Sequence, residues 1–326
     1  MSFKKNICII DSIYERHFSA PTVEQSIIKD GEIQLFHIKS SEDFASLPLE
    51  AIDVMLVWAC VPSIAVNEKI LSRLSRCKAI VKVAVGYDNI ELKTAREFGI
   101  PVYNIPDYGT EEVADHSMAL LLSMIRKIAY MDKISKNDAW DWSKIKPAHR
   151  IRGRKMGIIG FGRIGGAVAK RAQAFGIDVV FYDPYVQSGI EKTFGVRRAD
   201  TLIELLESVD YISIHASLTE TSHHLIGPKE FERIKKGALI VNTARGSIID
   251  KTSLTHALEA GTIAMAGLDV IEGEPFVSDN LKVASNIILT AHSAFYSEEA
   301  FQEMREKSAR MANLILAGTP SRNLLN

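Results

Sequence analysis

The sequence predicts an α/β protein with two open parallel-sheet domains, the second inserted into the first. Short apolar runs rich in Val and Ile alternate with helical patterns along most of the 326 residues, which is typical of parallel sheets built from βαβ units. A glycine-rich turn begins a second series of such runs near Gly160. The last helical segment, Ser297–Leu316, has no strand after it, so we expect it to pack back on the first domain.

The first domain is expected to contain short strands separated by helices. Helical patterns at Asn67–Arg76 and Glu91–Phe98 separate several of the apolar runs. The expected strands are Asn6–Ile10, Ile33–His37, Val54–Trp58, Ala79–Val85 and Pro101–Asn104.

The pattern then changes to a long helix. We expect Thr110 to cap it, and Glu111 and Glu112 suit the positive end of a helix. Met118–Ile125 is strongly apolar, which fits either the core or an interface between subunits. An irregular stretch, Ser135–Pro147, leads from this helix to the glycine-rich turn.

The chain is expected to cross between the domains twice, near Asn104–Thr110 and near His292–Ser297. This assigns residues 1–104 and 297–326 to the outer domain and residues 105–296 to the inserted domain. The expected strands of the inserted domain are Met156–Ile159, Val179–Tyr182, Tyr211–His215, Leu239–Asn242, Ala264–Asp269 and Ile287–Thr290.

The glycine-rich turn has the spacing of a dinucleotide-binding motif. It reads KMGIIGFGRIGG, with an apolar strand before the glycines and a helix after them. Gly160 permits the tight turn, Gly162 leaves room for a pyrophosphate, and Gly165 lets the helix pack closely on the strand. The helix begins near Arg163 and Ile164, where unpaired backbone N–H groups can bind phosphates. Such a turn can also serve packing alone, but its context favours nucleotide binding.

Asp183 favours NAD over NADP. It ends the run DVVFYD and follows Gly165 by 18 residues, close to the distance expected for a ribose-binding acid. A carboxylate at this position accepts hydrogen bonds from the ribose 2′-hydroxyl and repels a 2′-phosphate. We therefore predict a Rossmann-like NAD-binding domain inserted into a flavodoxin-like substrate domain.

The composition argues against several other classes of protein. Hydrophobic residues make up 47% and charged residues 24%, and the net charge of −1 gives no general attraction for nucleic acid or anionic membranes. No apolar stretch reaches the ~18 residues of a membrane span, and the run before Asp11 is too short for a secretory signal. We therefore expect a cytoplasmic protein that binds neither nucleic acid nor membrane.

The sequence predicts no metal site. Cys8, Cys60 and Cys77 are few and odd in number, so we expect buried thiols instead of disulfides or a zinc cluster. Glu112 and His116 share one helix face without a third ligand at sensible spacing. His223 and His224 are expected to lie on the surface.

Polar residues follow the strands of the second domain, where an open α/β sheet binds its ligands. Arg245 follows LIVNTA, Asp269 ends MAGLD, and His292 follows IILTA. Glu274 lies just beyond, in the loop EGEP. Each could be a solvated or structural residue by itself, but their common position favours a shared site.

These residues meet the needs of hydride transfer between a nicotinamide and a 2-hydroxy acid. The reaction needs a base for the hydroxyl proton and a cation for the carboxylate and carbonyl oxygens. His292 suits the first need and Arg245 the second, and Glu274 would orient the imidazole and favour its protonated form. Val85 and Gly86, which follow AIVKVA, could bind the substrate carboxylate through backbone N–H groups. We expect the reaction in a cleft between the domains.

Several blocks of the chain together resemble the D-2-hydroxyacid dehydrogenase family, in the order of that family and across nearly the whole length. They are VGYDNIE at 85–91, PDYGTEEVADH at 106–116, GIIGFGRIG at 157–165, NTARGSIID at 242–250, GLDVIEGEP at 267–275 and TAHSAFYSEEA at 290–300. The resemblance implies that Arg245, Glu274 and His292 are the catalytic trio and that Asp269 receives the nicotinamide carboxamide. It implies further cofactor contacts at Thr110, His215 and Thr243.

The resemblance also bears on the branch of the family and on assembly. The tail AHSAFYSEEA and the WDW at 140–142 are similar to the branch that contains C-terminal-binding proteins. Phe295 would then form an aromatic wall of the substrate pocket, although it could equally be a packing residue. A homodimer through the NAD-binding domains, with an arm that carries Trp140 and Trp142, is implied as well. Ser217 and Ala291 stand where the family usually has proline, which bears on loop rigidity.

Two functions from different classes stay open. The first is an NAD-dependent oxidoreductase that interconverts a small 2-keto acid and its D-2-hydroxy acid. The second is an NAD(H)-sensing, corepressor-like binding protein with little turnover, which has no chemical need for the trio. Glu274 favours the hydroxyacid branch, because formate dehydrogenases have an amide there, whereas some phosphite oxidisers share the pattern. The side chain of the substrate stays open, from glyoxylate, pyruvate, hydroxypyruvate and phosphohydroxypyruvate to aromatic keto acids.

Overall fold

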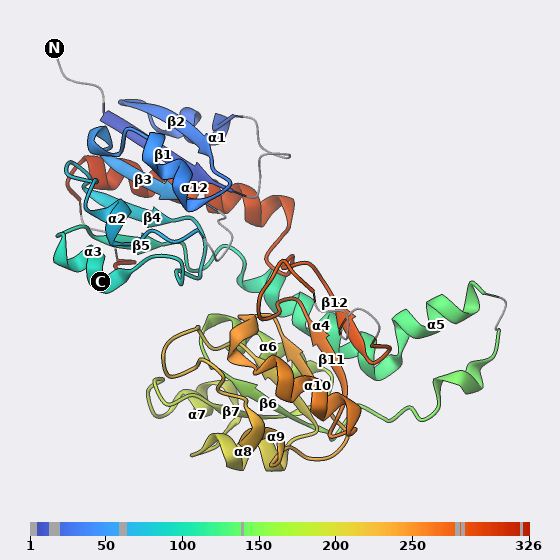
Figure 1. The fold of residues 1–326 in the computed structure, drawn as a ribbon. Coiled ribbons are helices and arrows are strands. Elements are labelled where there is room, and N and C mark those ends of the chain that lie inside the picture. The colour runs from blue at the N-terminus through green and yellow to red at the C-terminus, as the bar shows by residue number, and fades with distance from the viewer. Residues whose placement is uncertain are drawn as a thin grey trace. The chain divides into compact units, whose positions relative to one another are not determined.

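The computed structural model describes residues 5–12, 20–58, 64–137, 140–277, 281, 284–319 and 322–326. The chain divides into two compact units, Met1–Tyr108 with Ser297–Asn326, and Gly109–Tyr296 (Figure 1). The first division was expected after residue 104, but the outer unit continues to Tyr108. The reason is local, since Ile105 is buried and its backbone N–H still donates to the Ala84 carbonyl at 3.1 Å.

The outer unit is built on a five-stranded parallel sheet of order β2-β1-β3-β4-β5, the flavodoxin-like order. Its helices include two 3-10 turns, Ser41–Ser46 and Leu49–Ala51. The strands are β1 Lys5–Asp11, β2 Gly31–His37, β3 Val54–Val57, β4 Ala79–Lys82 and β5 Val102–Asn104, and the α-helices are α1 Thr22–Ile27, α2 Glu68–Leu71, α3 Leu92–Glu97 and α12 Glu298–Leu316.

The last helix, α12, returns to this sheet and packs on α1, β3 and β4 (Figure 1). Ser297 caps it by accepting the Ala300 N–H at 2.9 Å. Arg305 is buried in α12 and donates two hydrogen bonds, of 3.1 and 2.8 Å, to the buried carboxylate of Glu24 on α1. A buried ion pair of this kind holds the two helices together, because separating the two side chains would leave an unpaired charge in the protein interior, which costs free energy.

Two elements of the outer unit are shorter than expected by three residues or more. The strand predicted to reach Val85 ends at Lys82, and beyond it the side-chain amide of Asn104 donates to the Val85 carbonyl at 2.7 Å. The predicted helix 67–76 is α-helical only over Glu68–Leu71. Val85 and Gly86 therefore lie in the bend that follows β4.

The inserted unit has a seven-stranded sheet of order β12-β11-β10-β9-β6-β7-β8, parallel throughout. Counted from β6, this is the Rossmann order extended by one strand, with its switch point between β6 and β9. The two-residue strand β8 was not expected from the sequence. The strands are β6 Lys155–Ile159, β7 Asp178–Tyr182, β8 Arg197–Arg198, β9 Tyr211–Ile214, β10 Ala238–Asn242, β11 Ile263–Leu268 and β12 Ile287–Leu289.

Helices cover both faces of this sheet. Met118, Leu121 and Met124 of α4 pack with α6 in one core cluster, so the apolar run 118–125 serves the core. Leu205 of α8 and Leu254 of α10 lie in the cluster on the other face. The helices are α4 Thr110–Arg126, α5 Ile128–Ser135, α6 Arg163–Ala174, α7 Ile190–Phe194, α8 Leu202–Ser208, α9 Pro228–Phe231 and α10 Lys251–Glu259, with 3-10 turns η4 Trp142–Ile145 and η5 Gly246–Ile248.

The expected cap of the long helix was wrong by one residue. Gly109 is the N-cap of α4, and Thr110 lies one residue inside the helix. A Cβ on Gly109 would lie 3.4 Å from the carbonyl oxygen of Phe295, so this close approach favours glycine at the cap position.

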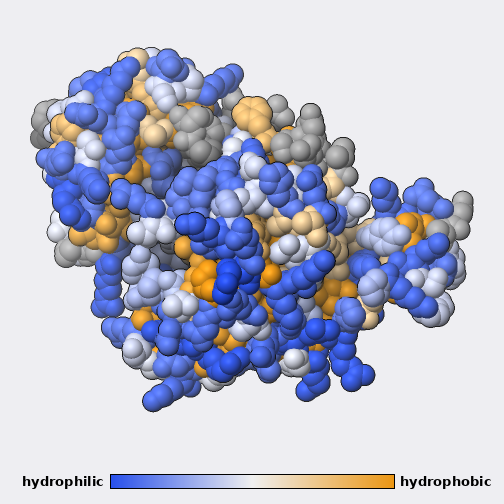
Figure 2. Space-filling model, turned by 60° about the horizontal axis from the view of Figure 1, so that its bottom comes forward, coloured by the Kyte–Doolittle hydropathy of each residue, from blue (hydrophilic) through white to orange (hydrophobic). Residues whose placement is uncertain are grey.

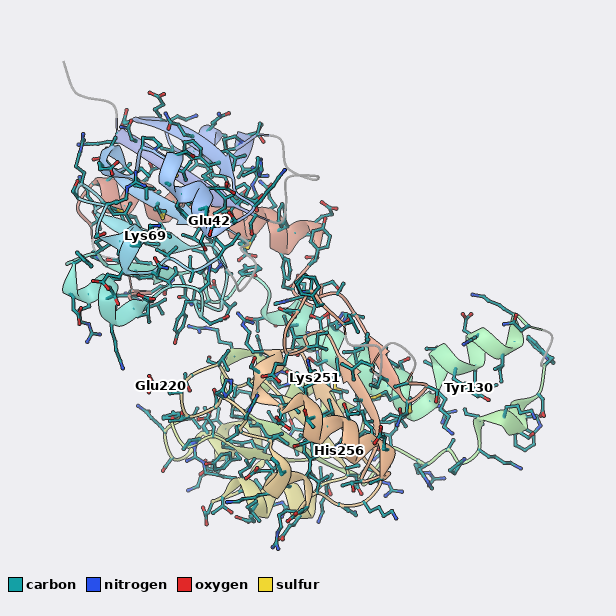
Figure 3. The ribbon with its side chains drawn as sticks, viewed as in Figure 1. Glu42, Lys69, Tyr130, Glu220, Lys251 and His256 are labelled. Carbon is teal, nitrogen blue, oxygen red and sulfur yellow. The ribbon has the colours of Figure 1, made fainter. Side chains whose placement is uncertain are left out.

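Exposed apolar side chains are concentrated after α4. Helix α5 has no buried residue, and Tyr130 on it is 45% exposed (Figure 3). Trp140 and Trp142 are 92% and 73% exposed. The face of the molecule shown in Figure 2 is mostly hydrophilic, with hydrophobic patches between the polar side chains. None of the described helices is long and apolar enough to cross a membrane.

Two of the three cysteines lie in the described residues, and both are buried. Burial raises the pKa of the Cys8 thiol well above its usual range and that of Cys77 to about 12. Both thiols are therefore protonated and poorly reactive at neutral pH. Cys60 lies outside the described residues.

Candidate active site

The candidate residues of the inserted unit follow three adjacent strands at one edge of the sheet. Asn242 pairs with Leu268 in the parallel register of β10 and β11, and Leu268 pairs with Leu289 of β12. Arg245, Asp269 and His292 come directly after these three strand ends. The register therefore brings together residues that lie up to 47 positions apart in the sequence.

The turn that carries Arg245 is shaped by Asn242, a residue that sequence reasoning did not single out. The buried side chain of Asn242 accepts the Ala244 N–H at 3.0 Å and donates to the Arg245 carbonyl at 2.9 Å. The Arg245 guanidinium donates to the Ala244 carbonyl at 2.7 Å, and the side chain is half-buried. An Asn at the end of a strand, followed by a turn, was the signal available in the sequence.

Asp269 holds the loop that contains His292. Its carboxylate is buried and accepts hydrogen bonds from the Thr290 hydroxyl at 2.6 Å and from the backbone N–H groups of Ser293 and Ala294 at 2.9 and 3.0 Å. The Asp269 carbonyl also accepts the His292 N–H at 2.8 Å. Asp269 thus fixes the backbone on both sides of His292, a role that was not expected from the sequence.

The same network reaches helix α4. The Nε2 atom of His116 lies 3.0 Å from the Thr290 hydroxyl oxygen and 3.7 Å from Oδ1 of Asp269. The hydroxyl of Ser117 lies 2.8 Å from that of Thr243 and donates to the Val113 carbonyl at 2.7 Å. The ring of His116 on α4 therefore makes a polar contact with the loop of His292.

The imidazole of His292 is bonded to Glu274. Nδ1 of His292 lies 2.7 Å from Oε1 of Glu274, and the ring is 44% exposed. The backbone of His292 has φ of +52°, a left-handed conformation that is uncommon for a residue other than Gly or Asn. With Nδ1 bonded to the carboxylate, Nε2 makes no hydrogen bond to a described residue and is the atom available to exchange a proton.

The glycine-rich turn meets the geometric conditions of a dinucleotide site. Gly160 has φ of +88°, and a Cβ there would lie 2.5 Å from the Ala216 backbone nitrogen. A Cβ on Gly165 would lie 2.2 Å from the Gly160 carbonyl oxygen, so α6 packs closely on β6. A Cβ on Gly162, in contrast, would meet no atom within 4 Å, which leaves open space beside the N–H groups of Arg163 and Ile164.

Asp183 lies at the end of β7, beside this turn. Its Oδ2 accepts the Phe161 N–H at 2.8 Å, and its Oδ1 accepts the Tyr185 N–H at 2.8 Å. Each oxygen keeps a second lone pair, and the side chain is half-buried. A ribose hydroxyl can therefore still donate to this carboxylate.

His215 lies across the switch point from Gly160. Its backbone N–H donates to the Ile159 carbonyl at 2.7 Å, and its Nε2 lies 2.7 Å from the Ser213 hydroxyl. Burial lowers the pKa of His215 to about 3, so the ring is neutral at physiological pH. Its Nδ1 is buried without a hydrogen-bond partner among the described residues. A buried nitrogen of this kind is a polar group that a bound ligand could satisfy.

The open space at Gly162, the carboxylate of Asp183 and the unsatisfied His215 nitrogen together fit an NAD molecule. Thr243, which is buried against Ser117, and Thr110, in the first turn of α4, lie in the same unit. Phe295 is half-buried and packs edge-to-face with Tyr296, their ring centroids 6.3 Å apart. Val85 and Gly86 belong to the outer unit.

Comparison with known protein families gives a match over more than half of the chain. Residues 118–294 match the model of the D-isomer specific 2-hydroxyacid dehydrogenase, NAD binding domain. The sequence is 34% identical over 316 residues to a glyoxylate reductase of Korarchaeum cryptofilum, which covers 96% of this chain and 91% of that protein. It is 36% identical over 267 residues to a glyoxylate reductase of Thermococcus litoralis, with 80% of each chain covered.

The fold is also similar to solved structures. D-Lactate dehydrogenase from Aquifex aeolicus, in complex with NAD and lactic acid, superimposes with a TM-score of 0.83 at 28% identity and with 96% of each chain covered. The likeness extends over both units of the chain, so the parallel sheets and their order are those of a known enzyme fold.

Proposed function

The chain belongs to the family of D-isomer specific 2-hydroxyacid dehydrogenases, and from this premise we propose that it reduces a small 2-keto acid with His292, Glu274 and Arg245 as its catalytic residues. The enzyme class and the cofactor follow from the family: it is an NAD-dependent 2-hydroxyacid dehydrogenase. The observation that carries the residue assignment is the 2.7 Å contact between His292 and Glu274 at the strand edge where ligands bind.

The proposed acid–base step is performed by the imidazole. In the reduction direction, protonated His292 donates the proton at Nε2 to the carbonyl oxygen of the substrate, and Glu274 keeps the ring oriented through Nδ1. Arg245 binds the substrate oxygens and stabilises the negative charge that develops on the carbonyl oxygen. Bound NADH supplies the hydride. In the oxidation direction, neutral His292 accepts the hydroxyl proton.

The remaining contacts of the proposed site involve backbone N–H groups and further side chains. The N–H groups of Val85 and Gly86 bind the substrate carboxylate, and Phe295 contacts the substituent of the substrate. The N–H groups at the start of α6 and the carboxylate of Asp183 hold the pyrophosphate and the adenosine ribose, and Asp269, Thr110, Thr243 and His215 contribute further cofactor contacts. The open space at Gly162 and the unsatisfied nitrogen of His215 support this arrangement.

Glyoxylate is the first substrate to test. The two relatives with the sequence identities given above are glyoxylate reductases. We expect glyoxylate and hydroxypyruvate to be reduced faster than aromatic keto acids.

A steady-state assay over a panel of keto acids, with NADH and NADPH in parallel, tests the proposal. We expect turnover within about 1–10³ per second for at least one small keto acid, and a loss of at least about 100-fold in His292→Gln. Wild-type turnover in His292→Gln would refute the assignment of the acid–base residue. Turnover below about one per minute for every acid would instead favour the NAD(H)-sensing alternative. The likeness to the branch of C-terminal-binding proteins stays a prediction.

We further propose that the protein forms a homodimer through its NAD-binding unit. The exposed apolar side chains of α5 and the tryptophans at 140 and 142 support an interface in this region. Light scattering on the wild type and on Trp140→Ala/Trp142→Ala should give a dimer and a monomer respectively. A monomeric wild type would refute the proposal. The cytoplasmic location also stays a prediction.

A further inference from the structure

We propose that His224 is a positioning residue that joins the loops carrying Arg245 and Glu274, and that it acts through Glu272. The proposal rests on the proposed function, since it takes Arg245 and Glu274 to be catalytic. The sequence predicts a surface histidine at His224, and no pattern in it singles out Glu272.

The side chain of His224 lies between two carboxylates from different loops. Its Nε2 lies 2.6 Å from Oε1 of Glu272, in the loop after β11. Its Nδ1 lies 3.8 Å from Oδ2 of Asp250, the N-cap of α10. In Figure 3, Glu220 labels the loop that carries His224, and Lys251 labels the first turn of α10. A single half-buried ring thus contacts both loops.

The backbone of His224 is also held in a defined position. Its φ of +50° is left-handed, and its N–H donates to the Ser247 carbonyl at 2.8 Å, two residues after Arg245. A conformation of this kind costs free energy and persists only where the surrounding contacts require it. The loop of His224 is therefore fastened to the Arg245 turn by its backbone and to the Glu272 loop by its side chain.

The Glu272 loop is in direct contact with the Arg245 turn. A Cβ on Gly246 would lie 2.0 Å from the Ile271 carbonyl carbon and 2.2 Å from the Glu272 nitrogen, so only glycine fits between the two backbones. Glu274 is bonded back to the same loop, because its N–H donates to the Ile271 carbonyl at 3.3 Å. A displacement of Glu272 therefore moves the supports of Arg245 and Glu274 together.

A bound metal ion is the alternative explanation for the cluster formed by His223, His224 and Glu272. His223, His224 and Glu272 place their ligand atoms within 4.8 Å of one another, and the rings of His223 and His224 stack with centroids 4.0 Å apart. However, Nε2 of His224 is already hydrogen-bonded to Glu272, and the exposed His223 is not needed for that contact. The hydrogen-bonding account thus predicts that His223 is dispensable, whereas a metal site requires it.

The test compares His224→Asn with His223→Asn in the full-length enzyme. Asn tolerates a left-handed backbone but is too short to reach Glu272, so His224→Asn removes the contact without adding strain. We expect kcat to fall about tenfold in His224→Asn, with the Kd for NADH from fluorescence titration unchanged, and no change in His223→Asn. Prior treatment with EDTA should leave the wild type unchanged.

Three further variants make the test independent of folding defects. Glu272→Met, which has no oxygen to accept from the ring, should lower kcat by a similar factor, and the double variant His224→Asn/Glu272→Met should lose no more than either single variant, because each substitution removes the same contact. His224→Gln, which keeps a donor near Glu272, should recover part of the rate.

Additive losses, or a wild-type kcat in His224→Asn, would overturn the proposal. Equal losses in His223→Asn, or a loss with EDTA, would assign the cluster to a metal. An active wild type combined with an active His292→Gln would reject the proposed function instead.

Discussion

The hydroxyl of Thr290 donates to the buried carboxylate of Asp269 at 2.6 Å, and this contact joins the end of β12 to the end of β11. His292 lies two residues beyond Thr290, and its own N–H donates to the Asp269 carbonyl at 2.8 Å. The position of the proposed catalytic imidazole therefore depends on a threonine and an aspartate that need not touch the substrate.

Thr290→Val should destabilise the protein and slow the enzyme. The substitution keeps the shape of the side chain but leaves Asp269 without one of its donors, which costs about 1–3 kcal/mol in the free energy of unfolding. Denaturant unfolding and kcat with glyoxylate measure the two effects. Thr255→Val, which removes only a hydroxyl bonded to the Lys251 carbonyl within α10, is the matched control. An unchanged unfolding free energy in Thr290→Val would contradict the role given to this hydroxyl.

Arg245→Lys should lower kcat/KM by about 100- to 1,000-fold. Lysine keeps the positive charge but presents no planar pair of donors to a carboxylate and a carbonyl oxygen. Steady-state kinetics with glyoxylate measure the effect. Arg233→Lys serves as the control. The side chain of Arg233 is exposed and pairs with Glu207, so this variant should have the kcat/KM of the wild type. A small change in kcat/KM for Arg245→Lys would mean that the guanidinium does not bind the substrate.

Much of the inserted unit could be predicted from the sequence because its signals are local. The glycine turn from Gly160 to Gly165 and the acid Asp183 follow each other within one βαβ unit, so spacing alone identifies them. The polar residues after the strand ends were also found in this way, since parallel strands end at one edge. The two-residue strand β8 has too little pattern to be recognised.

The contacts that position the site could not be predicted, because they join distant segments through polar atoms. Asn242 and Thr290 carry no signal that separates them from other strand-end residues, yet they shape the turns of Arg245 and His292. The contact of His224 with Glu272 spans 48 residues and depends on how two loops meet above the sheet. Hydrophobic periodicity reports which face of an element is buried and says nothing about such pairs.

Asp183→Asn should reduce the preference for NADH over NADPH. The amide lacks the negative charge that repels the 2′-phosphate of NADPH. It also accepts a weaker hydrogen bond from the ribose hydroxyl of NADH, because a neutral acceptor binds a donor less strongly than a charged one. We expect the ratio of kcat/KM for the two cofactors to change by about 10- to 100-fold. Asn retains an oxygen for the Phe161 N–H, so its contact with the glycine turn should persist, whereas the Tyr185 N–H loses its acceptor because the amide nitrogen replaces Oδ1. An unchanged ratio would indicate that another residue selects the cofactor.

His215 should make the protein less stable in acid. Because burial lowers the pKa of His215 to about 3, the folded state keeps the ring neutral, whereas the unfolded chain protonates it near the ordinary value of about 6.5. The unfolded state therefore binds the proton first, and the stability that comes from the neutral ring is present above about pH 6.5 and is lost as pH falls from there toward 3.

His215→Gln, which cannot be protonated, should lose less stability over this range than the wild type. Thermal unfolding at pH 7, 6, 5 and 4 measures the difference in Tm between the two proteins. His256→Gln, on the exposed side of α10 (Figure 3), should follow the wild type at every pH. A constant difference in Tm between His215→Gln and the wild type would show that this ring does not set the acid sensitivity.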